Sequence, residues 1–159
     1  MIKAILAIDQ ANGLATDAGI PWDIPTDQNY VHQTISTQPV VMGYRTYQEM
    51  KVLPKNDPSF VVIHPGTKLR DGFVAVSDVN QLIKKYQNSK QTLWVIGGAK
   101  IYQELLPQTQ ELYVTRVGSL FNCTKFFPEF EAQYTMIETS PPKQENGIPF
   151  HFEIWRRNV

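Results

Sequence analysis

The sequence is poor in the residues that several protein classes require. Among its 159 residues Cys123 is the single cysteine, which excludes an internal disulfide framework and a multi-cysteine zinc site. The three histidines, His32, His64 and His151, lie far apart without metal-ligand spacing, so no metal site is predicted. Fifteen basic residues are balanced by fifteen acidic residues. Because a basic excess is lacking, the composition argues against a dedicated nucleic-acid-binding protein.

Long apolar runs are absent as well. No run approaches the roughly 18 residues of a transmembrane helix, and segment 1–10 lacks the long apolar region and cleavage site of a signal peptide. We therefore expect a soluble, cytoplasmic protein, and its zero formal charge makes a monomer the default. A hydrophobic content of 42% argues against disorder, and no repeat or linker divides the chain, so a single domain is predicted over residues 1–159.

The hydrophobic pattern alternates between buried strands and amphipathic helices. Apolar runs predict strands at 2–9, 39–42, 59–63, 73–76, 92–96 and 112–117, and a C-terminal edge hairpin at 134–139 and 150–156 around a polar turn. Helical spacing predicts helices from Pro25 with Thr26 as N-cap, near 46–50, after a Ser77 cap, and over 100–106 closed by Pro107. The chain is thus predicted to be an α/β three-layer sandwich with a mostly parallel mixed sheet and an antiparallel C-terminal hairpin.

An acidic residue heads the apolar face of the helix predicted from Pro25. Asp27 shares that face with Tyr30, Val31 and residues 34–35. An acid in a first helical turn is commonly a complement to the helix dipole. On an apolar face, however, an ionised carboxylate is costly unless it is paired, and a hydrogen-bond-donating ligand ring is one possible partner. Trp22, at the end of the long aperiodic loop 10–24, is interpreted either as core or as a wall for such a ring.

Two further segments share the order strand, glycine, helix start. They are residues 40–46, which contain Gly43, and residues 94–100, which contain Gly97 and Gly98. Glycine lets backbone approach a ligand closely, and helix starts attract anions. Neither segment matches the usual dinucleotide or nucleoside-triphosphate fingerprints, so ordinary strand–helix turns remain an alternative. Arg45 and Lys100 beside them could offset phosphate charge.

These segments, in this order, resemble the dihydrofolate reductase family along nearly the whole chain. The resemblance rests on Ala7, Pro21-Trp22, Pro25-Thr26-Asp27, residues 39–43 (PVVMG), Thr46, Leu53-Pro54, residues 95–98 (VIGG), Ile101-Tyr102, residues 112–115 (LYVT) and Phe127-Pro128. Each fragment alone is weak, whereas their joint order and spacing are specific.

The resemblance implies NADPH-dependent reduction of 7,8-dihydrofolate to 5,6,7,8-tetrahydrofolate, with hydride transfer to the pterin ring and Asp27 assisting protonation. The residues implied in catalysis are Asp27, Trp22, Tyr102 and Thr115. Those implied in substrate binding are Ile5, Asp27, Val31, Met50, Leu53, Ile96 and Thr115. Those implied in cofactor binding are Ala7, Leu14, Ile20, Gly43, Arg45, Thr46, Ile96, Gly97, Gly98, Ala99, Lys100, Ile101 and Tyr102. A cis Gly97–Gly98 peptide, a closing 10–24 loop and a water as immediate proton donor are also implied.

Departures from the family pattern cluster where the substrate tail is expected. The family usually has an arginine shortly after the Leu-Pro pair that grips the folate glutamate, and residues 53–58 contain none. Lysine is a point charge and does not reproduce that fork; His32, Lys51 or Lys55 is a candidate substitute. Reduction of another pteridine or of a riboflavin-pathway pyrimidine, and a non-catalytic nucleotide-binding module, therefore stay open as alternatives.

Overall fold

Parallel strands with helical connections build one part of the chain, and antiparallel strands build the other. The computed structural model describes residues 1–51 and 54–159. Its contacts separate into two compact units. The first unit comprises Met1–Ala4 and Thr34–Gln110, and the second comprises Ile5–Gln33 and Glu111–Val159. The expectation of a single domain stays a prediction.

The first unit is an open parallel sheet whose strands follow the order β1-β6-β3-β4-β5. Its strands are the start of β1 (Ile2–Ile8), β3 (Val40–Gly43), β4 (Ser59–Val62), β5 (Phe73–Val76) and β6 (Leu93–Val95). Its helices are α2 (Tyr44–Glu49), α3 (Val79–Tyr86) and α4 (Ala99–Leu105), followed by a 3-10 turn at Leu106–Gln108. Because the strands are parallel, their carboxyl ends share one edge of the sheet.

Helix boundaries in the first unit differ from the predictions for local reasons. Helix α2 begins at Tyr44, directly after the β3 strand, rather than near residue 46. Asp78 caps α3 because its side chain accepts a hydrogen bond from the Asn80 amide, so the predicted Ser77 cap was wrong. Pro107 lies inside the 3-10 turn, where its missing N–H is tolerated, instead of closing the helix.

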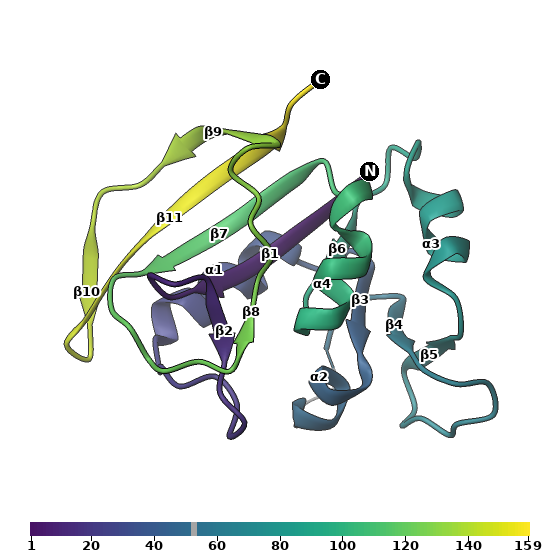
Figure 1. The fold of residues 1–159 in the computed structure, drawn as a ribbon. Coiled ribbons are helices and arrows are strands. Elements are labelled where there is room, and N and C mark those ends of the chain that lie inside the picture. Colours follow the sequence, from purple (N-terminus) through teal and green to yellow (C-terminus); the bar gives the residue numbers. More distant parts are fainter. Residues whose placement is uncertain (52–53) are drawn as a thin grey trace. The chain divides into compact units, whose positions relative to one another are not determined.

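The second unit is built on two long antiparallel strands, β7 (Glu111–Val117) and β11 (Ile148–Arg157), which run side by side in Figure 1. The strands β9 (Tyr134–Thr139) and β10 (Lys143–Glu145) both pair with β11 on its other side, and β1 neighbours β7. Most of helix α1 (Pro25–Ile35) belongs to this unit, as do the short paired strands β2 (Gly13–Ala15) and β8 (Lys125–Phe126).

The antiparallel C-terminal hairpin predicted at 134–139 and 150–156 is confirmed, since β9 pairs antiparallel with β11. Two other sequence predictions for this unit needed correction. The polar turn expected at 141–149 contains the strand β10 and a two-residue turn at Asn146 and Gly147, whose φ angles of 53° and 75° suit a type I′ hairpin. The loop expected at 10–24 contains β2, which pairs with β8. The predicted α/β class, with mostly parallel strands and antiparallel C-terminal strands, is confirmed.

Apolar side chains fill the interior of both units in the way the strand patterns predict. In the first unit Val40, Val41 and Met42 are fully buried, as a strand covered on both faces requires. In the second unit Trp22 and Phe150 belong to one buried cluster. Among the described residues no helix is long and apolar enough to cross a membrane.

Candidate active site

A buried carboxyl–hydroxyl pair lies at the centre of the second unit. Asp27, in the first turn of α1, is 8% exposed, and Thr115, on β7, is 1% exposed. The Thr115 hydroxyl donates to Asp27 Oδ1 over 2.6 Å. The Tyr30 ring, on the next turn of α1, stacks on the Phe152 ring with centroids 4.0 Å apart, and Phe152 is the register partner of Thr115. The aromatic stack therefore holds α1 on the strand pair and brings the two polar groups together.

The surroundings of Asp27 change its acidity. Burial raises the pKa of Asp27, and the hydrogen bond from Thr115 lowers it by less. A carboxyl group with a raised pKa holds a proton closer to neutral pH than an exposed one does. Asp27 can therefore accept hydrogen bonds from a flat ring when ionised and retain a proton near the reacting group when neutral.

The first turn of α1 is capped from a distant part of the chain. The Thr26 amide donates to Glu145 Oε1 and the Thr26 hydroxyl donates to Oε2, each over 2.8 Å. The predicted N-cap role of Thr26 was wrong, because Thr26 lies inside a helix that begins at Pro25. Sequence reasoning missed Glu145, and the Asn146-Gly147 pair was the signal that would have revealed its hairpin.

Trp22, predicted either as core or as a wall for a flat ligand ring, is part of the core. Trp22 is buried with Ile24, Val117 and Phe150, and its ring meets the Phe121 ring edge-on at 5.3 Å. The interpretation as core is therefore correct for its packing, and its role toward a ligand stays a prediction. The other site residues predicted in this unit occupy β1 (Ile5 and Ala7), β2 (Leu14), the following loop (Ile20, which is 65% exposed) and α1 (Val31).

A second buried aspartate holds the start of the 10–24 segment. Asp9 is 1% exposed, and its carboxylate accepts from the amides of Ala11 at 2.9 Å, Gly13 at 2.8 Å and Phe121 at 3.2 Å. Burial alone would raise the pKa of Asp9, but these donors, with the Cys123 thiol, outweigh burial and lower it. Asp9 thus ties the segment to residues 119–123. Sequence reasoning saw Asp9 only as the end of a strand.

In the first unit, the two strand–glycine–helix segments come together at the carboxyl ends of β3 and β6. The Gly43 amide donates to the Gly97 carbonyl over 2.8 Å. The Gly97–Gly98 peptide is cis, as the family resemblance implies, and Gly97 has a φ of 124°. A Cβ on Gly97 would lie 3.3 Å from Thr46 Oγ1 and 3.6 Å from the Tyr102 ring. Both the close neighbours and the positive φ angle therefore favour glycine at position 97.

The predicted phosphate-binding cations lie at the surface near these glycines. The Arg45 side chain is 52% exposed and pairs with Glu49 at 3.1 Å. The Lys100 side chain is 87% exposed and lies 4.0 Å from Glu104. Each cation is thus accessible and paired within its own helix. The remaining predicted cofactor residues here are Ile96 and Ala99, which are half-buried, and Ile101, which is buried.

Of the predicted substrate-binding residues in the region 50–58, the structure describes Met50 but not Leu53. Met50 lies at the end of α2, where its carbonyl accepts from Arg70 Nη1 over 2.8 Å, and Leu53 lies outside the described residues. Asn56 is buried, and its amide donates to the carbonyls of Ser36 and Gln38. The Asn56 side chain is therefore committed to the backbone and does not present a carboxylate-binding group.

The donor set agrees with an organic dinucleotide better than with a metal. The half-buried backbone of Gly43 and Gly98 and the accessible cations nearby suit phosphate groups. Within residues 1–51 and 54–159 there is no group of three or more His, Cys, Asp or Glu side chains that could hold a metal ion. A nicotinamide dinucleotide is consistent with the residues present.

Comparison with known proteins places this geometry in a family. The model of the family described as "Dihydrofolate reductase" matches residues 1–157. Dihydrofolate reductase of Bacillus subtilis (strain 168) is 26% identical over 156 residues, covering 97% of this chain and 92% of that protein. The Buchnera aphidicola (subsp. Acyrthosiphon pisum, strain APS) enzyme is 28% identical over 160 residues, covering 98% and 99%.

A solved structure shows the same fold. Dihydrofolate reductase from Enterococcus faecalis, complexed with NADP(H) and RAB-propyl, is similar with a TM-score of 0.89 and 22% identity, covering 100% of this chain and 97% of that one. Since the family model matches nearly every residue, this chain belongs to the dihydrofolate reductase family.

Proposed function

We propose that this chain reduces 7,8-dihydrofolate to 5,6,7,8-tetrahydrofolate with NADPH, as an oxidoreductase acting on a CH–NH group. The observation that carries the proposal is the buried Asp27–Thr115 pair in a chain of this family. A carboxylate accepts hydrogen bonds from the ring N–H and the exocyclic amine of an aminopterin, which present two adjacent donors. A buried acid without such a partner would be costly to keep.

The proposed roles in the second unit concern the pterin. Asp27 orients the ring and its tautomer, Thr115 supports the Asp27 carboxyl, and the Ile5 carbonyl accepts from the exocyclic amine. A water donates the proton to the ring nitrogen, and the raised pKa of Asp27 favours that donation near neutral pH. Trp22 and Val31 contribute apolar walls. Closure of the 10–24 segment, through Leu14 and Ile20, excludes bulk water.

The proposed roles in the first unit concern the cofactor, which supplies the hydride when bound. Gly43, Thr46, Gly97 and Gly98, with residues 99–101, hold its phosphates through backbone and hydroxyl groups. Ile96 and Tyr102 contact the nicotinamide end of the cofactor. Arg45 pairs with the 2′-phosphate, so NADPH is preferred over NADH. Met50 and Leu53 are assigned to the substrate tail.

The test is NADPH oxidation with dihydrofolate, comparing the natural chain, Asp27→Asn and Asp71→Asn at several pH values. Asp71 is an exposed aspartate in a turn of the first unit and serves as the matched charge control. We expect turnover that collapses near neutrality in Asp27→Asn alone. No turnover by the natural chain, with NADPH still bound, would contradict dihydrofolate as substrate and point to another pteridine or a pyrimidine. No NADPH binding at all would contradict the enzyme itself.

The proposal also covers domain organisation, cellular location and oligomeric state. We infer a single functional domain over residues 1–159, acting as a cytoplasmic monomer without nucleic-acid partners. The match of the family model over residues 1–157 and the balanced charge support it. Light scattering after gel filtration would contradict the monomer if the measured mass were at least twice the 18.2 kDa of one chain.

Lys55 is one candidate anchor for the substrate tail. An unchanged KM for dihydrofolate in Lys55→Ala would exclude that residue as anchor.

A further inference from the structure

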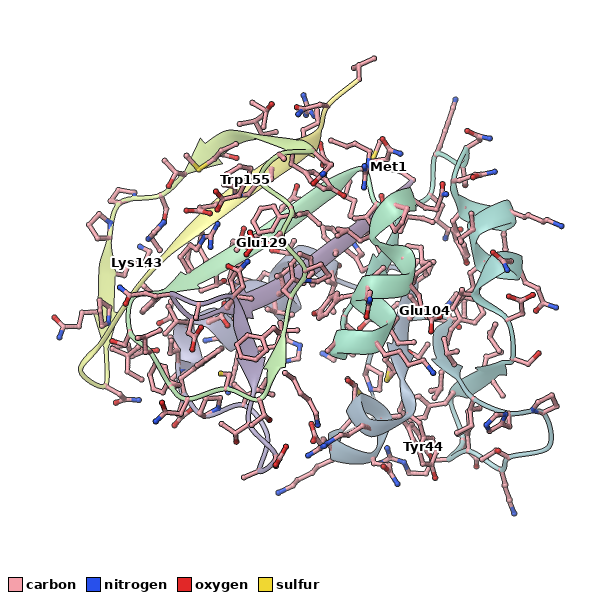
Figure 2. All side chains as sticks on the ribbon, viewed as in Figure 1. Met1, Tyr44, Glu104, Glu129, Lys143 and Trp155 are labelled. Atoms are coloured by element: carbon pink, nitrogen blue, oxygen red, sulfur yellow. The ribbon has the colours of Figure 1, made fainter. Side chains whose placement is uncertain are left out.

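The tip of the β10–β11 hairpin contacts the beginning of α1 through three hydrogen bonds. Two of them join the Glu145 carboxylate to the amide and the hydroxyl of Thr26. The third runs from Asn146 Nδ2 to the carbonyl of Asp23 over 3.1 Å. Glu145 pairs with Ile148 in the hairpin register, so the turn between them is short and its geometry well defined. Lys143, labelled in Figure 2, marks the start of β10.

The residue before helix α1 has no side chain that could accept a hydrogen bond from the first turn. Ile24, which precedes the helix, has no polar side chain, and its carbonyl accepts from the amides of Asp27 and Gln28. Pro25 has no N–H. The Thr26 amide is therefore the first free donor of the helix, and Glu145 supplies its acceptor from 119 residues away. A carboxylate at this end also interacts favourably with the helix dipole.

We propose that Glu145 is a positioning residue for Asp27, holding the first turn of α1 so that the Asp27 carboxyl stays against Thr115. The catalytic consequence rests on the function proposed above, whereas the positioning does not. Asp27 follows Thr26 directly, and its Oδ1 atom lies only 2.6 Å from the Thr115 hydroxyl. A first turn freed from Glu145 would let this short contact lengthen and let water reach a group that is 8% exposed.

Release of the first turn of α1 acts on Asp27 through its burial. Water access weakens the burial that raises the pKa of Asp27. Other titratable and charged groups also lie on the surrounding segments. They are Asp23, Tyr30 and His32 on the chain around α1, Lys143 on β10, Glu111, Tyr113 and Arg116 on β7, and His151, Glu153, Arg156 and Arg157 on β11. These groups are unchanged in every variant below, so a difference in the Asp27 titration between variants does not come from them.

The experiment uses three variants of the full chain. Glu145→Gln removes the charge and one of the two acceptors. Thr26→Val keeps the charge and removes the hydroxyl partner. Glu138→Gln removes an equal charge from an exposed position on β9 of the same unit and is the matched control. The first readout is the pH titration of the Asp27 carboxyl carbon by NMR in the protein without ligands. The second is KM for dihydrofolate beside the Kd for NADPH.

We expect the Asp27 titration to move to lower pH in Glu145→Gln, to move less in Thr26→Val, and to stay unchanged in Glu138→Gln. We expect KM for dihydrofolate to rise about 3- to 10-fold in Glu145→Gln, the scale of a lost helix cap. The Kd for NADPH should stay within about twofold of that of the natural chain, since most predicted cofactor residues belong to the other unit.

An Asp27 titration that is the same in Glu145→Gln and Glu138→Gln would overturn the positioning role, whatever the kinetics. Failure of the proposed function gives a different pattern. The natural chain would then not turn over dihydrofolate, while the titration would still report whether Glu145 acts on Asp27.

Discussion

Replacing Thr115 by valine removes one hydroxyl from a buried pair and almost nothing else, because the two side chains are nearly the same shape. At pH values where Asp27 is ionised, the lost bond is a charge-assisted one of 2.6 Å. A hydrogen bond to a charged group contributes about 1.5–3 kcal/mol to stability, and a bond between neutral groups about 0.5–1.5 kcal/mol. Thr115→Val should therefore lower the free energy of unfolding by about 1.5–3 kcal/mol at high pH, and by roughly 1 kcal/mol less once Asp27 is protonated.

The same substitution should change the pH dependence of the reaction. The Thr115 hydroxyl favours the ionised form of Asp27, so its removal raises the pKa of Asp27 further. The fall of activity with rising pH that follows deprotonation of Asp27 should then begin at higher pH than in the natural chain. KM for dihydrofolate should rise as well, because the carboxyl is less firmly oriented.

Urea unfolding at one pH above and one pH below the Asp27 titration measures the first expectation, and pH–rate profiles measure the second. Thr109→Val is a useful control, since Thr109 is equally buried but its hydroxyl donates to a neutral carbonyl of Leu105. Its cost should be the same at both pH values. Equal losses at both pH values for Thr115→Val, or a rate profile displaced to lower pH, would refute the reasoning.

Three further substitutions test the site from other directions. Asp27→Asn should abolish most turnover near neutrality yet raise the free energy of unfolding there. A carboxyl group with a raised pKa makes the folded protein less stable as pH rises through that pKa, and asparagine removes this effect. A lower free energy of unfolding in urea titrations at neutral pH would contradict this. Arg45→Gln should reduce the ratio of kcat/KM for NADPH over NADH about tenfold or more, and equal ratios would remove Arg45 from the 2′-phosphate site. Asp9→Asn should cost about 1–3 kcal/mol at neutral pH. That cost should shrink as pH falls through the lowered pKa of Asp9, and urea titrations showing a cost independent of pH would count against the role of its charge.

The sequence was most informative where hydrophobic spacing or residue order forms a local pattern. The helical spacing around Asp27 predicted both the helix and the buried acid. The shared order of strand, glycine and helix start singled out Gly43 and Gly97, which the structure joins by a hydrogen bond, while their role toward a ligand stays a prediction. Such patterns are local, so burial and periodicity are enough to find them.

Features that depend on distant partners were not predictable in this way. Glu145 lies in a polar stretch with no hydrophobic period, and its contact with Thr26 spans 119 residues. The strand β10 lies in the same polar stretch, and its pairing with β11 is not specified by single-segment patterns. The choice of Asp78 over Ser77 as cap depends on backbone angles at the helix start, where boundaries are least certain from sequence.

The two buried aspartates of the second unit show how a functional acid differs physically from a structural one. Asp9 is surrounded by three backbone amides, which lower its pKa, so its charge is satisfied by the fold itself. Asp27 is similarly buried, but its described partner is one hydroxyl, and burial raises its pKa. The fold therefore leaves hydrogen-bonding capacity on Asp27 that a bound ring with two donors can use. This difference explains why removing the charge should weaken the protein at Asp9 and strengthen it at Asp27, while only the second change should stop the reaction.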